Sequence, residues 1–247
     1  MKKYLLTGLC VLLVFGSVYA QDQATYMYEA IYLTPIPGKI SELNAGLAAH
    51  NKKYHGKGDY AAFVQSVLTG KRTGNYVWAM GPGNFARLDS RPAQEGGHDD
   101  DWNKNVMSYI SGMSNAEYWV RDDDAFYSPE EYSGDKIRVR FYKVKRGQNE
   151  KFGDMYDKIL QVYREKGYNR PVTLYWNSFP TAHGRNAATV TGIPNWALFD
   201  QENTFVADFE SINGEDSWAK WLEEWWSITE WIDNEVRQTI PALSGVE

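Results

Sequence analysis

The stretch FVQSVLTGKRTGNYVWAMGPGNFARLD, from Phe63 to Asp89, decides the fold because a related stretch follows it later in the chain. Shifted by 111 positions, the distance from Asp89 to Asp200, it aligns without a gap with LYWNSFPTAHGRNAATVTGIPNWALFD, which begins at Leu174. The identical pairs are Asn75/Asn186, Gly81/Gly192, Asn84/Asn195, Ala86/Ala197 and Asp89/Asp200. At several other positions of the alignment, an aromatic or aliphatic residue in the first stretch faces another aromatic or aliphatic residue in the second. This self-similarity indicates an internal duplication.

Working outward from these stretches, each half of the chain predicts the order β-α-β-β-α. The predicted elements of the first half are strands at 26–33, 60–68 and 75–80, and helices at 39–54 and 98–113. Those of the second half are strands at 136–144, 172–179 and 187–191, a helix at 150–166, an additional strand at 203–212, and a last helix from Glu215 that includes Ile232. Residues 118–127 fit either a helix end or a short strand. The pattern is that of the ferredoxin-like split βαβ fold.

The amino terminus has the pattern of a secretory signal peptide. Lys2 and Lys3 precede the apolar run from Leu5 to Phe15, and residues 18–20 end the segment with a small residue at the position that precedes cleavage. We therefore predict export to the periplasm or the extracellular space, with residues 1–20 removed and no membrane insertion of the mature chain. The domains expected after cleavage are residues 21–134 and 135–247, one ferredoxin-like repeat each.

Composition excludes several classes of function. The single cysteine, Cys10, lies in the predicted signal peptide, so the mature chain has no thiol for a disulfide, a nucleophile or a metal. The formal charge changes from −6 to −8 when Lys2 and Lys3 are removed, and no basic stripe is present, which argues against nucleic acid. The chain is rich in aromatic residues, with 10 Trp, 17 Tyr and 10 Phe. Such residues suit either a large core or a pocket for flat ligands.

The order of elements, the aromatic first strand, the turns at 81–85 and 192–196 and the tryptophan-rich last helix resemble the dimeric α+β barrel superfamily. This superfamily includes antibiotic-biosynthesis-monooxygenase-like domains. The resemblance implies an α+β fold in which two ferredoxin-like repeats pack sheet to sheet within one chain. Such a chain would be a monomer that acts as a pseudo-dimer.

Strand alternation supplies the main hypothesis for a site. One face of the strand at 137–142 carries Arg138, Arg140 and Tyr142, and the opposite face is apolar. If the two sheets face each other, these guanidinium groups would enter an aromatic-walled pocket for an acidic or polar aromatic molecule. The other predicted ligand-binding residues are Tyr28, Trp78, Tyr175 and Asn177. The alternative is an intramolecular ion pair or a solvated sheet face.

His183 and Arg185 are the catalytic candidates, because His183 aligns with Arg72 and marks a divergence between the two stretches. An exposed turn is the alternative for this pair. The run from His98 to Asp101 lacks the spacing of a known metal motif, so we predict that its acids cap a helix and that no metal is bound. His50 and His55 are assigned to the end of a helix, where cationic side chains suit the helix dipole.

Three functions remain open. The first is small-molecule binding or cofactor-independent, monooxygenase-like catalysis in an Arg and aromatic pocket, with no cofactor. The second is a non-catalytic binding or scaffold domain of the cell envelope. The third follows from a resemblance to chlorite dismutases and dye-decolourising peroxidases, which implies a haem held by a proximal histidine and a distal arginine. No serine-hydrolase, phosphate-loop, dinucleotide or zinc-protease motif is present.

Overall fold

The computed structural model describes residues 26–90, 95–180 and 184–245. The predicted signal peptide, residues 1–20, lies outside these ranges, so export stays a prediction. Within the ranges, no helix is both long enough and apolar enough to cross a membrane.

Each half of the chain contains both strands and helices. The first half forms β1 (Met27–Pro35), α1 (Ile40–Tyr54), β2 (Ala62–Val67), β3 (Tyr76–Gly83), α2 (His98–Asn105), β4 (Ile110–Met113) and β5 (Glu117–Tyr127). The second half forms β6 (Lys136–Val144), α3 (Asn149–Glu165), β7 (Val172–Asn177), β8 (Ala187–Ile193), α4 (Phe205–Asn213), α5 (Ser217–Ile228) and β9 (Thr229–Thr239). The predicted mixed α+β class is confirmed.

Eight antiparallel strands close into a barrel. The first half contributes the neighbours β5-β1-β3-β2, and the second half contributes β9-β6-β8-β7. The pairings β2–β9 and β5–β7 join the two sets at both edges, so the ring is complete. The short strand β4 lies outside the ring and pairs with residues 33–35 of β1. Closure leaves no exposed barrel edge to pair with another chain.

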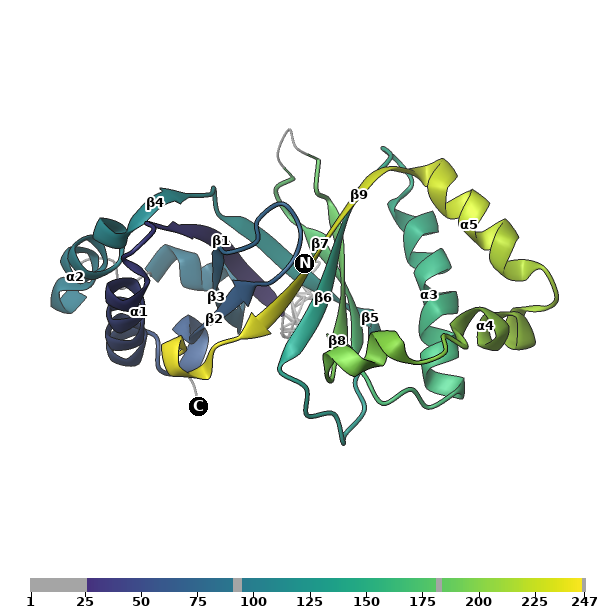
Figure 1. The fold of residues 1–247 in the computed structure, drawn as a ribbon. Helices are drawn as coiled ribbons and strands as arrows, with labels where there is room; N and C mark the ends of the chain where they lie inside the picture. The colour runs from purple at the N-terminus through teal and green to yellow at the C-terminus, as the bar shows by residue number, and fades with distance from the viewer. Residues whose placement is uncertain (1–25, 91–94, 181–183, 246–247) are drawn as a thin grey trace, which may run out of the picture.

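Alternation along the strands separates an inner core from two outer ones. In Figure 1, α1 and α2 cover one side of the barrel, and α3, α4 and α5 cover the other. Strand β6 shows the division: Val139 and Phe141 belong to the inner cluster, whereas Tyr142 and Val144 pack against the helices of the second half. The stripe of Trp218, Trp221 and Trp225 on α5 also packs in that outer core, as expected from its helical spacing.

Two predicted elements of the second half are wrong. Residues 205–213 form helix α4 instead of a strand, because Phe205 and Phe209, four residues apart, both pack their rings on Trp218 at centroid distances of 5.6 and 5.1 Å. Helix α5 ends at Ile228, and Ile232 belongs to β9, which pairs with both β6 and β2. Barrel closure therefore overrides the continuation of the helix.

The first half contains a similar correction. Helix α2 ends at Asn105, and residues 110–113 become strand β4 because they pair with β1. The ambiguous residues 118–127 lie in strand β5, which pairs with β1 and β7.

Helices α1 and α2 approach each other closely at Gly46. A Cβ atom built at Gly46 would overlap the carbonyl oxygen of Asn105, the last residue of α2. Because both groups belong to helix backbones, no side-chain rotation can relieve this overlap. The absence of a side chain at Gly46 therefore sets the distance between α1 and α2.

We expect Gly46→Ala to lower the free energy of unfolding by about 3 kcal/mol, measured by urea denaturation, because the two helices must separate. The matched control is Gly153→Ala in α3, where an added Cβ would meet no atom within 4 Å. Alanine favours helix over glycine, so the control should leave stability unchanged or raise it by about 1 kcal/mol. Equal stability of the two variants would contradict the packing described here.

Candidate functional site

The barrel interior holds a cavity of about 350 Å³ that is open to solvent. Every one of the eight barrel strands contributes at least one lining residue. The lining residues are Tyr28, Ala30, Phe63, Gln65, Ala79, Gly81, Pro82, Trp119, Ile137, Val139, Phe141, Tyr175, Ala188, Val190 and Arg237. A volume of this size accommodates a small organic molecule.

Small residues create the space and aromatic rings form its walls. Ala30, Ala79 and Ala188 occupy inward positions on three strands and leave room between the larger side chains. Tyr28 packs edge-on against Tyr175, with ring centroids 6.0 Å apart. Trp119 lies against Phe141 at 5.6 Å. This arrangement offers a largely apolar slot to a planar molecule.

An arginine cluster, consisting of Arg72, Arg185 and Arg237, lies beside the cavity. The three guanidinium carbons are 4.2, 5.7 and 5.4 Å from the centroid of the Tyr32 ring. They are 5.6, 4.6 and 5.6 Å from the centroid of Phe141, which lines the cavity. Arg237 itself reaches the lining. Positive charge is therefore concentrated at one part of an otherwise apolar interior.

Glu235 holds this cluster in place. The Tyr32 hydroxyl donates a hydrogen bond of 2.6 Å to Glu235 Oε1, and Arg237 Nε donates one of 2.7 Å to the same oxygen. Arg72 Nε donates a longer bond of 3.4 Å to Oε2. Burial alone would raise the pKa of Glu235, but Arg237, the Tyr32 hydroxyl and Arg72 together hold it below its ordinary value. The carboxylate is therefore ionised at neutral pH.

Arg185 is paired with a second buried carboxylate. Its Nη2 lies 2.6 Å from Glu117 Oε1, and both side chains are largely buried. The other terminal nitrogen, Nη1, is buried and makes no hydrogen bond to the described residues. The cluster thus places three guanidinium groups against two deeply buried carboxylates, and it includes an unused donor. Such an arrangement favours an anion nearby.

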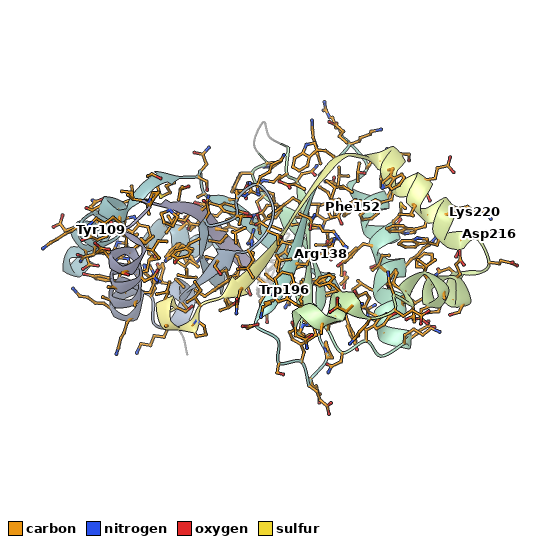
Figure 2. The ribbon with its side chains drawn as sticks, in the orientation of Figure 1. Tyr109, Arg138, Phe152, Trp196, Asp216 and Lys220 are labelled. Atoms are coloured by element: carbon orange, nitrogen blue, oxygen red, sulfur yellow. The ribbon has the colours of Figure 1, made fainter. Side chains whose placement is uncertain are left out.

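The expected direction of β6 is wrong. Arg138, Arg140 and Tyr142 face the layer of α3–α5, and the apolar face with Ile137, Val139 and Phe141 lines the cavity. Figure 2 shows Arg138 and Phe152 on the side of the barrel that carries these helices. Burial and the neighbouring charge of Arg140 lower the pKa of Arg138. The reason for the reversal is that Tyr142 packs on Phe152 and Trp225 of the outer core.

The remaining predicted site residues divide into two groups. Tyr28 and Tyr175 line the cavity, and Arg185 lies next to it; a role in ligand binding stays a prediction. Trp78 faces the helices instead and donates from Nε1 to Asn51 Oδ1 at 2.9 Å. Asn177 donates to the carbonyl oxygen of Arg185 at 3.0 Å and so fixes the segment that carries this arginine. His183 lies outside the described residues.

Sequence reasoning missed Arg237, Glu235 and Trp119. The alternation of Asp233, Glu235 and Arg237 would have indicated an inward polar face, but only if residues 229–239 had been predicted as a strand.

A second group of chemically active side chains lies outside the barrel, between α1 and α2. One ring nitrogen from each of His50, His55 and His98 lies within 4.8 Å of the others. His50 and His55 are buried, and His98 is partly buried. The sequence predicts a helix end at His50 and His55 and a helix start at His98, and no pattern in it places the three residues together.

Comparisons with known proteins give matches among solved structures alone; no family model and no curated protein matches. A monooxygenase-like protein from Lactobacillus acidophilus NCFM is 12% identical, with a TM-score of 0.54 over 87% of this chain and 94% of the other. An anthrone oxidase-like protein is 9% identical, with a TM-score of 0.54 over 89% and 92%. Chlorite dismutase from Candidatus Nitrospira defluvii, in complex with imidazole, is 7% identical, with a TM-score of 0.56 over 87% and 92%. These similarities show the ferredoxin-like dimeric α+β barrel fold, and at such identities the fold alone.

The haem alternative can be tested against the cavity. Haem iron takes an axial histidine, thiolate, methionine or tyrosine ligand. Among the described residues that line the cavity there is no His, Cys or Met. Burial raises the pKa of both Tyr28 and Tyr175, so neither is a ready phenolate ligand. The lining residues described therefore do not fit a haem in this cavity.

We expect Glu235→Gln to lower the free energy of unfolding by about 3–5 kcal/mol at pH 7, because it leaves the arginine cluster without its central carboxylate. The pKa of Glu235 is lowered in the folded state, so its contribution is complete above the ordinary value of 4.5 and is lost as the pH falls through the folded value. The difference between wild type and variant should therefore shrink in urea denaturation below about pH 4.5.

The control for this variant is Glu230→Gln on the same strand. Glu230 pairs with Lys143 at the surface, where its side chain is 43% exposed. Its replacement should change stability by less than about 1 kcal/mol. If Glu235→Gln behaves like this control at pH 7, the buried network does not contribute as described.

Proposed function

We propose that the barrel cavity binds a small planar aromatic molecule that carries an acidic group. The observation that carries the proposal is the combination of an apolar, aromatic-walled cavity with the arginine cluster at its side. The aromatic part of the ligand would lie among Tyr28, Trp119 and Tyr175. Its anionic group would lie toward Arg237 and the neighbouring Arg185, which lies beside the cavity and not in its lining. The proposed ligand class is the one expected from sequence. The arginines that would recognise its charge are those of the arginine cluster, and not Arg138 and Arg140 of β6.

The count of hydrogen-bond donors supports an anion. Glu117, Glu235 and the partly exposed Asp233, which lies 3.9 Å from Arg72, balance the formal charge of the three guanidinium groups but do not occupy all of their donors. A ligand carboxylate would use a donor capacity that the protein leaves incomplete at Arg185 Nη1. Hydrogen bonds between a guanidinium and a carboxylate are charge-assisted and strong in such surroundings.

The titration states favour binding over acid–base catalysis. Burial raises the pKa of Tyr28 and Tyr175, so both phenols stay neutral near pH 7. For Arg237, burial lowers the pKa, but Tyr32 and Glu235 more than offset it, so the guanidinium stays charged. Among the described lining residues, none is therefore placed to remove a proton. Non-catalytic binding is the simplest function of this cavity.

A monooxygenase-like activity is the second candidate, and the similarity to monooxygenase-like and anthrone oxidase-like structures supports it. In this case an electron-rich ligand would itself reduce dioxygen, so that one oxygen atom enters the oxidised ligand and the other leaves as water, and the cavity would orient the ligand. Comparison of ligand consumption with and without oxygen distinguishes this activity from simple binding.

We also infer that the two halves, residues 21–134 and 135–247, are ferredoxin-like repeats of one ancestral unit, so that one exported chain acts as a pseudo-dimer. The spacing of the elements supports this inference. Strand β6 begins 109 residues after β1, from Met27 to Lys136, and α3 begins 109 residues after α1, from Ile40 to Asn149.

The proposal predicts discrimination between 2-naphthoate and the neutral 2-naphthamide. By isothermal titration calorimetry, we expect the carboxylate to bind at least about 10-fold more tightly, because only it gains charge-assisted bonds in the arginine cluster. An absorption spectrum of the purified protein should accompany the titration, since a Soret band would indicate haem.

Two variants test whether the ligand binds in the barrel cavity. Gln65→Glu adds a negative charge to the lining and should weaken 2-naphthoate about 10-fold or more while leaving the amide unchanged. Ala188→Leu fills the cavity and should weaken both ligands. Equal affinity for the two ligands, or binding unaffected by Ala188→Leu, would refute the proposal.

A further inference from the structure

Three of the four histidines of the chain form a compact histidine triad, His50, His55 and His98. His50 lies near the end of α1, His55 directly follows this helix, and His98 opens α2. The ring centroids are 5.2 Å apart for His50 and His55, 4.8 Å for His50 and His98, and 5.2 Å for His55 and His98. The imidazoles therefore form a nearly equilateral triangle.

Each imidazole of the triad is oriented by an oxygen acceptor at Nδ1. His50 Nδ1 lies 2.8 Å from Asp101 Oδ2, and His98 Nδ1 lies 2.9 Å from Asp99 Oδ1. His55 Nδ1 lies 2.8 Å from the carbonyl oxygen of Tyr60. Carboxylate and carbonyl oxygens can only accept, so Nδ1 is the donor in all three rings. In the neutral rings, Nε2 therefore carries a lone pair.

Two features mark the Nε2 side of the triad. His50 Nε2 is buried and makes no hydrogen bond to the described residues. His55 Nε2 and His98 Nε2 lie 3.1 Å apart, which in neutral rings brings two lone pairs against each other. A cation bound by these atoms would resolve both features.

The surroundings favour a bound cation. Asp99 and Asp101 lie behind two of the rings, the arrangement that commonly orients metal-bound histidines and increases their basicity. Trp102 lies against His50 and Trp78 against His55, at ring-centroid distances of 5.0 and 5.1 Å. These indoles exclude water from one side of the triad and keep the imidazoles in place.

We propose that His50, His55 and His98 bind a divalent late transition-metal ion, of which Zn²⁺ is the representative, through their three Nε2 atoms. A tetrahedral ion with Zn–N distances of about 2.05 Å needs ligand nitrogens about 3.3 Å apart. The Nε2 atoms of His55 and His98 are 3.1 Å apart, close to this value, and one ring nitrogen of each of the three histidines lies within 4.8 Å of the others.

The proposed site retains an open coordination position. The described residues offer no fourth His, Cys, Asp or Glu to the group. The His98 side chain is 17% exposed, so the ion would meet solvent on that side. Three protein ligands with a fourth position for water or a small ligand is the coordination of catalytic rather than structural zinc. This site is separate from the barrel cavity and does not depend on the ligand proposed there.

The proposal is tested with purified, metal-free protein titrated with Zn²⁺ by calorimetry, and with Co²⁺ followed by visible absorption. We expect one ion per chain and the intense absorption of tetrahedral Co²⁺. His98→Ala should lower the affinity for Zn²⁺ at least about 100-fold, more than the loss typical of an outer-shell residue. Because His98 is partly exposed, this variant should keep its circular dichroism spectrum.

Adjacent acids provide a matched comparison. Asp101→Ala removes the acceptor of His50 and should weaken Zn²⁺ about 10–100-fold. Asp100→Ala removes an exposed acid of the same helical turn that makes no hydrogen bond to a described histidine, and it should change affinity little. His183→Ala tests the fourth histidine and should also have little effect.

Several results would overturn the proposal. They are no Zn²⁺ binding by the wild type, octahedral Co²⁺ alone, equal losses for Asp100→Ala and Asp101→Ala, or loss of binding in His183→Ala. Long-range ¹H–¹⁵N correlation spectra give an independent measure, since Zn²⁺ should shift Nε2 of three histidines. Shifts explained by protonation alone, without response to Zn²⁺, would show that the rings share a proton instead.

Discussion

Two strand pairs, β2 with β9 and β5 with β7, are the interactions on which the molecule depends, because they join its halves into one ring. Without them each half would expose two unpaired edges and the apolar inner face of an open four-stranded sheet. With them, all eight strands direct alternate side chains to a shared interior, and the cavity with its arginine cluster exists only there. The outer faces then need helices, which α1–α2 and α3–α5 supply.

The order of elements could be predicted from sequence, but the direction of each face could not. Turn glycines and helical spacing located β1, α1, β6 and α3 within two residues of their observed bounds. On β6, however, both faces are rich in large side chains, so alternation alone did not show which face was inward. Tyr142 faces outward because it packs on Phe152 and Trp225, and these contacts join residues that are distant in sequence. Arg237 and Glu235 are not predicted as site residues because the sequence pattern extends the last helix to Ile232, into the residues that form β9.

The histidine triad was unpredictable for a different reason. His50 and His55 are separated by four residues, a spacing found in zinc fingers, but the cysteine pair of that motif is missing and His98 follows more than forty residues later. What brings His98 to the others is the close packing of α2 on α1, which requires Gly46 to have no side chain. The residue spacing within one helix does not reveal a contact between side chains of two helices that depends on how closely their backbones pack. Acids at the start of α2 were recognised as capping residues, although two of them orient imidazoles.

Strand β3 and its Trp78 side chain lie between the cavity and the triad. Trp78 points outward and lies against His55, whereas its neighbour Ala79 points inward and lines the cavity. Consecutive residues of one strand cannot move independently. A shift of β3 that moves Ala79, and so alters the shape of the cavity, therefore also moves the Trp78 indole that packs against His55. A displacement of Trp78 by His55 moves Ala79 in the same way. In thermodynamic terms, any free energy of coupling carried by this strand acts on both sites by the same amount.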